Sequence, residues 1–208
     1  MTAARAFLRD GRGAGAAEFA LILPLFLLFL LGIIDAGRFA WAFNQAEKAT
    51  QIGARWAVVT NPVPSNLASY NFVSSSVAQG SVVPQSAFAG VQCKTVGAST
   101  APVCDCKTSN ACGFNATIED TTAWAALVAR MAEIYPGLTA ANVVVDYDWS
   151  GLGYAGDPNG ADVAPLVTVG LRDIEFQPMT TMLFGVDLPI PSASYTLTME
   201  DGSGTDSN

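Results

Sequence analysis

The sequence predicts an α+β protein in which a long N-terminal membrane-spanning helix continues into an ectodomain with an antiparallel sheet packed on helices. Three observations carry this prediction. Residues 19–34 form an uncharged apolar run, residues 35–59 continue with helical spacing and without proline, and residues 143–199 contain three segments of strand character. Helical and strand segments that occupy separate parts of a chain are typical of the α+β class.

The apolar run is the most distinctive segment. Its 16 residues would span about 24 Å as a helix, against a hydrocarbon core of about 30 Å. Small residues on both sides can extend it, so we expect a transmembrane helix over residues 14–36. Arg5, Arg9 and Arg12 precede the run, and the positive-inside rule then places the N-terminus in the cytoplasm and the rest of the chain outside.

Glu18 stands at the start of this run, five residues after Gly13. An ionisable group at membrane depth costs roughly 2.5–3.5 kcal/mol or more, and a chain that retains one there commonly uses it. The segment fits a signal peptide, although small residues are poorly placed for its cleavage site. It also fits a plain membrane anchor, or a segment whose basic leader, residues 1–13, is removed after Gly13. We favour the third interpretation, because the freed amine of Ala14 at a helix N-terminus could pair with Glu18 of a neighbouring subunit.

The front of the chain also resembles a known family. Residues 15–25 read Gly-Ala-Ala-Glu-Phe-Ala-Leu-Ile-Leu-Pro-Leu, with Gly-Ile-Ile-Asp-Ala-Gly-Arg at 32–38 and Gly-Ala-Arg at 53–55. In this register the chain is similar to the TadE-like family, the pseudopilins or minor pilins of the bacterial tight-adherence (Flp-type) pilus system. The resemblance is close over residues 13–59 and holds only in outline beyond them.

The resemblance implies a role in assembly of a tight-adherence type IV pilus, without catalysis and without a cofactor. A prepilin peptidase would cut between Gly13 and Ala14, which makes Glu18 the fifth residue of the mature chain. Other implied partners are pilins or pseudopilins and the inner-membrane assembly platform. The chain would be a single-pass protein of the bacterial inner membrane, with its C-terminal domain in the periplasm or in the pilus. The alternative from a different class is a membrane-anchored periplasmic binding or enzymatic domain with an unprocessed anchor.

Composition narrows the chemistry of the ectodomain. The 208 residues include no histidine, which removes Ser-His-Asp and Cys-His nucleophile systems and histidine-ligated zinc. Residues 1–34 carry a net charge of +1 and the remainder −9, which together give the total of −8. A strongly acidic ectodomain offers no basic patch to release phosphate counterions, so nucleic acid is not an expected partner.

Outside the membrane, residues 37–60 are expected to form a helical stem that ends at the proline-containing residues 61–64. One face of this stem carries aromatic and small residues at helical spacing. They are Phe39, Phe43, Ala46, Thr50, Gly53 and Ala57. This stripe fits the core face of the protein's own domain or a face between subunits, and both can hold on different faces of the helix.

The ectodomain is expected over residues 61–200, followed by a polar, disordered tail over residues 201–208. Its first part, residues 61–116, is rich in Ser, Val, Gly and Ala. This composition favours loops and irregular strands, with extended runs at 81–83 and 90–93.

The second half of the ectodomain has clearer signals. A helix is predicted over residues 121–135, with Asp120 as its N-cap and Pro136-Gly137 as its stop. Three strands are then predicted, at residues 143–149, 166–176 and 194–199.

The four cysteines lie within 20 residues, on the predicted outer side of the membrane; they are Cys93, Cys104, Cys106 and Cys112. An even number in an oxidising compartment predicts two disulfides. Two pairings stay open, Cys93–Cys104 with Cys106–Cys112, or Cys93–Cys106 with Cys104–Cys112. Free thiols and a four-cysteine zinc site are the alternatives, although the spacing lacks the paired C-x2-C arms of such sites, so no metal is expected.

Two acidic clusters could indicate further chemistry. Residues 157–162 lack the spaced ligands and closing glutamate of an EF-hand, and their Pro-Asn-Gly sequence predicts a turn, with an ion site as the alternative. Asp146 and Asp148 share one face of a predicted strand. Paired carboxylates can act as acid and base, but a solvated sheet face is the expectation, so no catalytic residue is predicted.

Overall fold

The computed structural model describes residues 14–108, 112, 116, 118–181, 185–200 and 202–205. The chain divides into two compact units. Unit 1 comprises the described residues of Met1–Trp41 and Glu175–Leu188, and unit 2 those of Ala42–Ile174 and Pro189–Asn208. Gly13 and the expected leader lie outside the described residues.

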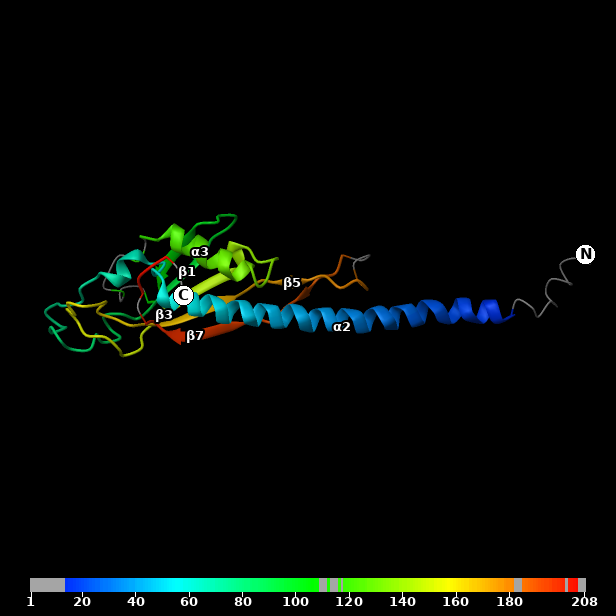
Figure 1. Ribbon diagram of the computed structural model, residues 1–208, viewed down its shortest axis with the longest axis horizontal. Helices are drawn as coiled ribbons and strands as arrows, with labels where there is room; N and C mark the ends of the chain where they lie inside the picture. The colour runs from blue at the N-terminus through cyan, green and yellow to red at the C-terminus, as the bar shows by residue number, and fades with distance from the viewer. Residues whose placement is uncertain are drawn as a thin grey trace, which may run out of the picture. The chain divides into compact units, whose positions relative to one another are not determined.

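Helix α2, Ala14–Val59, is a single helix of 46 residues (Figure 1). It begins where the transmembrane helix was expected to begin and ends one residue before the expected end of the stem. Pro24 lies inside it and removes one backbone hydrogen bond, which membrane helices tolerate. At the other end, the backbone N–H and hydroxyl of Thr60 donate to the Trp56 carbonyl at 3.1 and 2.8 Å. The prolines that follow stop the helix there.

The first half of α2 is apolar and exposed. In the described part of the chain, α2 is the one helix that is long and apolar enough to cross a membrane, and no residue of its most apolar 18-residue window is buried. Large apolar side chains are exposed along the run, among them Leu21, Leu25, Leu28, Phe29 and Ile33. A helix that is apolar on every side needs an apolar surrounding, so α2 is a candidate membrane anchor.

Unit 1 also contains a hairpin alongside α2. Its strands, β5 (Glu175–Phe176) and β6 (Leu188–Pro189), form a two-stranded sheet. The segment runs beside α2 toward the apolar half of the helix (Figure 1). The Phe176 ring packs edge-on against Phe39 with a centroid separation of 5.5 Å.

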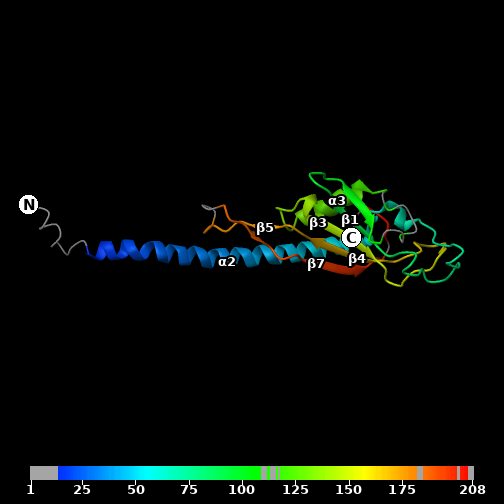
Figure 2. The ribbon, with the colours of Figure 1, turned by 180° about the vertical axis from the view of Figure 1, so that it is seen from behind.

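Unit 2 is built on a five-stranded antiparallel sheet with strand order β2-β1-β3-β4-β7. Figure 2 labels its strands β1, β3, β4 and β7. The strands are β1 (Val91–Thr95), β2 (Pro102–Cys106), β3 (Val143–Asp148), β4 (Leu166–Leu171) and β7 (Ser194–Thr198). The antiparallel sheet, the helix packed against it and the long apolar helix confirm the predicted α+β class.

The strand predictions were partly wrong in their bounds. The predicted strand over residues 166–176 is two strands, because Asp173 has a φ of +52° and turns the chain between β4 and β5. Residues 81–83 form no strand. The edge strand β2 was not predicted, since a proline opens it and proline disfavours a strand assignment.

The core of unit 2 lies between the sheet and two helices. One sheet face is buried through alternate residues, which include Cys93, Val143, Val145, Tyr147, Val167 and Val169. Helix α3 (Thr121–Ala132) buries Trp124, Leu127 and Met131. Asp120 caps it as predicted, accepting from Thr122 N and Ala123 N at 2.9 Å each. The helix ends three residues earlier than expected.

At Gly53, helix α2 lies close both to helix α3 and to the sheet of unit 2. A Cβ at this position would lie 2.7 Å from Met131 Sδ and 3.1 Å from Val169 Cγ1. Ala46, Thr50 and Ala57 on the same face are buried as well. These residues of the predicted stripe therefore form a core face of the protein's own domain.

The C-terminal residues 202–205, from the segment expected to be disordered, lie against the end of α2. Gly202 N donates to the Val58 carbonyl at 3.4 Å. Asn61 N donates to the Gly204 carbonyl, and Gly204 N donates to Asn61 Oδ1, each at 2.9 Å. The first bond gives a donor to the Val58 carbonyl, one of the last four carbonyls of the helix, and the other two join the C-terminal segment to Asn61.

Candidate functional site

The first candidate is the start of α2. Ala14 is its first residue, and Glu18 follows four positions later. Glu18 is exposed, and no described residue forms an ion pair with it. Its carboxylate is therefore accessible to a cationic group from outside the described chain.

A second carboxylate of α2, Asp35, holds the hairpin of unit 1 to the helix. Its Oδ1 accepts from Met179 N at 2.8 Å, and its Oδ2 accepts from the backbone N–H and the hydroxyl of Thr180 at 2.8 and 2.9 Å. Arg38 Nη1 lies 3.1 Å from Oδ1. With these four donors the carboxylate is only 6% exposed.

Arg38 contacts both Asp35 and the hairpin. Its guanidinium lies 5.2 Å from the centroid of the Phe176 ring, a cation–π distance. Asp35 was not singled out from the sequence. Its place directly after the apolar run and three residues before Arg38 was the available signal, but its backbone partners lie about 145 residues further along the chain.

The four cysteines form two disulfides, Cys93–Cys104 and Cys106–Cys112. This is the first of the two pairings that the sequence left open. Cys93 and Cys104 are directly opposite in the antiparallel ladder of β1 and β2. The bridges therefore fasten the edge strand and the segment that follows it.

The paired aspartates of β3 hold a lysine. Lys107 Nζ lies 2.8 Å from Asp146 Oδ1 and 2.7 Å from Asp148 Oδ1. Partial burial by itself lowers the pKa of Lys107, but hydrogen bonds and charge interactions with the two carboxylates outweigh it, and its pKa is raised. Asp146 also accepts from Gln92 Nε2 at 2.9 Å. The pair is thus part of a polar sheet face with a structural cation.

The acidic loop of residues 157–162 is organised around a buried carboxylate. Asp162 is 4% exposed and accepts from Phe72 N at 2.6 Å and from Asp157 N at 3.1 Å. The carboxylate therefore ties two loops together. In the described part of the chain, no group of three or more Cys, Asp or Glu side chains is placed to hold a metal ion.

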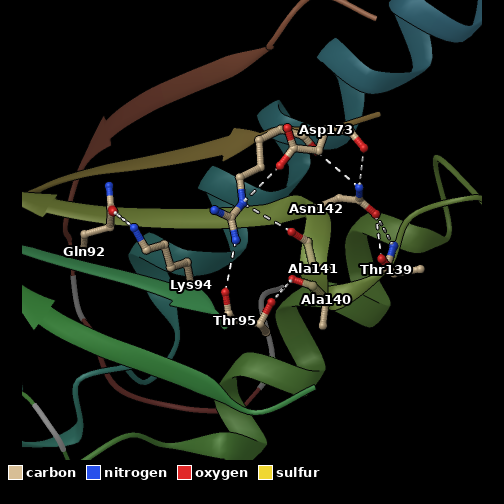
Figure 3. Close-up of polar contacts among 9 residues, drawn as sticks. Gln92, Lys94, Thr95, Thr139, Ala140, Ala141, Asn142 and Asp173 are labelled. Carbon is tan, nitrogen blue, oxygen red and sulfur yellow. Dashed lines mark hydrogen bonds and ion pairs between the residues drawn. The ribbon is translucent and has the colours of Figure 1, made fainter. Parts of the chain in front are cut away.

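A third polar cluster closes one end of the sheet (Figure 3). Arg172 donates to the carbonyls of Ala141 and Thr95 at 3.3 and 3.1 Å. The Asn142 side chain donates to the carbonyls of Arg172 and Asp173 at 3.2 and 3.0 Å. All these acceptors are backbone carbonyls, so the cluster holds the turn after β4.

A hollow of about 490 Å³ lies on unit 2, beside the loop at residues 159–164 and the end of β7. Among the described residues that line it, Glu200 is the one ionisable group. Acid–base chemistry needs a second acid or base beside such a carboxylate, and the described residues that line this hollow do not supply one. The ionisable groups of unit 2 singled out above are instead engaged in structural contacts.

The N-terminal half of α2, with its exposed apolar surface and the exposed carboxylate of Glu18, is therefore the main candidate functional segment. Residues 13–55 match the model of the TadE-like protein family, which confirms the resemblance read from the sequence. Neither the curated proteins nor the solved structures contain a match to the chain. The matched segment includes the two carboxylates of α2 described above, Glu18 and Asp35. Through residues 13–55, the chain carries a TadE-like segment.

Proposed function

We propose that the protein is a pseudopilin or minor pilin that takes part in assembly of a tight-adherence type IV pilus. The observation that carries this proposal is the family match over residues 13–55, which coincides with an exposed apolar helix that has a carboxylate at its start. A TadE-like segment indicates a pilus-associated protein and interaction with other pilus components. The more specific proposal, a pseudopilin or minor pilin, rests on the chemistry of helix α2.

In this proposal, α2 crosses the inner membrane once, through about residue 36. The N-terminus lies in the cytoplasm and the C-terminal domain in the periplasm, or in the pilus after assembly. The three arginines of residues 1–13 support this orientation by the positive-inside rule. The exposed apolar surface of the helix supports the span itself.

The proposal includes processing by a prepilin peptidase between Gly13 and Ala14. Cleavage there would leave a free amine at the first residue of α2, where the helix dipole adds partial positive charge. Glu18 of one subunit could then pair with the amine of its neighbour. Such a pair offsets part of the cost of a carboxylate at the membrane, so subunit contact and membrane insertion would favour each other.

The proposed role requires no catalysis and no cofactor. Its support is that the carboxylates of unit 2 singled out from the sequence have structural partners, Lys107 for the β3 pair and backbone amides for Asp162. The protein would act by assembling with other pilins and with the inner-membrane platform.

A matched pair of variants tests the role of Glu18. In Glu18→Ala, the carboxylate is lost, so we expect normal membrane levels of the protein but reduced pili in the sheared fraction. Glu47→Ala removes another exposed carboxylate of α2 beyond the apolar run, and we expect wild-type piliation. Immunoblots of membranes and of sheared pili measure both. Unchanged piliation in Glu18→Ala would contradict the assigned role.

A further inference from the structure

We propose that the hairpin of strands β5 and β6 is a second membrane contact, and that its described residues, 175–181 and 185–188, insert apolar side chains into the lipid surface beside α2. This inference rests on the proposed membrane span of α2. It assigns to the hairpin a partner, the headgroup–acyl boundary of a bilayer, that the family match over residues 13–55 does not cover.

The position of the hairpin along α2 is the first argument. Asp35 directly follows the apolar run of residues 19–34. Three hydrogen bonds to its carboxylate hold Met179 and Thr180 at this level of the helix. If the run lies in the hydrocarbon core, the hairpin is held where the core meets the headgroups.

Exposed apolar side chains are the second argument. Met179, Val186 and Leu188 are 51%, 47% and 44% exposed. From residue 176 to residue 188 the sequence has one charged side chain, that of Asp187. A short segment that is held against an anchor, exposes apolar side chains and carries almost no charge is suited to a lipid surface.

Two exposed side chains of α2 indicate how deep the hairpin would lie in the membrane. Trp41 is 67% exposed and the Arg38 side chain is 43% exposed, and both residue types are common at membrane–water interfaces. Trp41 lies six residues after Asp35, a rise of about 9 Å along the helix. If Trp41 marks the membrane–water interface, the hairpin held at Asp35 lies about 9 Å below it, within the roughly 5–10 Å by which interfacial apolar segments enter the headgroup–acyl boundary.

The hairpin also satisfies polar groups internally. The Thr181 hydroxyl donates to the Val186 carbonyl at 2.8 Å, and the backbone N–H groups of Met179 and Thr180 donate to Asp35. Unsatisfied backbone groups are costly near lipid. The same bonds that shape the hairpin therefore make contact with lipid less costly.

Single-cysteine reporters in the full chain test the proposal. All four native cysteines are paired in disulfides, so an added cysteine is the one reactive thiol. Val186→Cys reports on the hairpin, Leu28→Cys on the apolar run, and Val96→Cys on an exposed apolar position of unit 2. Each is labelled with an NBD fluorophore and reconstituted in vesicles of phosphatidylethanolamine and phosphatidylglycerol, with and without doxyl-lipid quenchers, one set shallow and one set deep in the acyl chains.

We expect the doxyl lipids to quench emission at positions 186 and 28 but not at position 96. If position 186 behaves like position 96 while position 28 is quenched, the hairpin contact is wrong and the span of α2 stands. If position 28 is not quenched, the span itself is wrong. Blue-shifted emission at position 186 without quenching would show that a protein surface covers the hairpin, which also overturns the proposal.

A second variant tests how the hairpin is held. Asp35→Ala removes the acceptor of three hydrogen bonds, so we expect quenching at position 186 to fall while quenching at position 28 is unchanged. Unchanged quenching at position 186 would contradict the positioning role of Asp35.

Discussion

The close approach of α2 to the core of unit 2 can be tested through Gly53. In Gly53→Ala, the new Cβ would lie 2.7 Å from Met131 Sδ and 2.9 Å from Met131 Cγ. Overpacking of this kind costs about 1–3 kcal/mol, and replacing a helical glycine by alanine returns about 1 kcal/mol. The net expectation is a loss of zero to about 2 kcal/mol in the free energy of unfolding.

Truncation of Met131 separates the cost of overpacking from the gain in helix propensity. Met131 is fully buried, so Met131→Ala alone should cost about 2–5 kcal/mol. In the double variant the truncated residue leaves room for the new Cβ. The double variant should therefore be more stable than the sum of the single changes predicts, by about 1–3 kcal/mol.

Chemical unfolding of the full chain in detergent micelles, followed by near-UV circular dichroism, measures this cycle. Gly37→Ala is the control, because no described atom beyond the nearby backbone of α2 itself lies within 4 Å of a Cβ at that position, and it should cause no loss. Additivity of the two changes within about 0.5 kcal/mol would refute the steric role assigned to Gly53.

Three further predictions concern unit 2. The Tyr147 hydroxyl accepts a hydrogen bond from the buried Val63 N–H at 3.0 Å, so Tyr147→Phe should lower the free energy of unfolding in urea by about 1–3 kcal/mol. The control, Tyr154→Phe, changes an exposed ring and should alter stability by less than about 0.5 kcal/mol. Equal effects of the two changes would contradict the role of the Tyr147 hydroxyl. Because the folded state raises the pKa of Lys107 above its ordinary 10.5, its stabilisation is complete below that pH and is lost as pH rises through the folded-state pKa. The stability difference between the wild type and Lys107→Gln should therefore shrink above about pH 10.5, and a constant difference in pH-dependent urea unfolding would argue against the ion pairs. Iodoacetamide should add no label to the native cysteines before reduction and four labels after it, as measured by intact mass, and labelling without reductant would contradict the disulfides.

Local patterns were sufficient to predict α2 and most of the sheet. The uncharged run and the proline-free segment after it required a long helix, and the alternation of β3 required a half-buried strand. The turn at Asp173 was not predictable in this way. Its positive φ is held by the side chain of Asn142, about 30 residues earlier in the chain, and no local pattern records such a contact.

The candidate site shows the same division. The register of Gly13 and Glu18 could be read from the sequence, because both lie in one short segment. The hairpin strands β5 and β6 have two residues each, too few for a periodic signal. The cysteine pairing depends on the register of β1 against β2, which places Cys93 opposite Cys104, and spacing alone could not decide it.

The N-terminal residue of the protein isolated from native membranes tests the central claim most directly. N-terminal sequencing and intact mass should give a chain that begins at Ala14, and a strain without prepilin peptidase should retain the leader. The shorter form should also be the one that co-purifies with sheared pili. A chain that begins at Met1 in cells with an active peptidase would contradict the assignment of this protein as a processed pseudopilin.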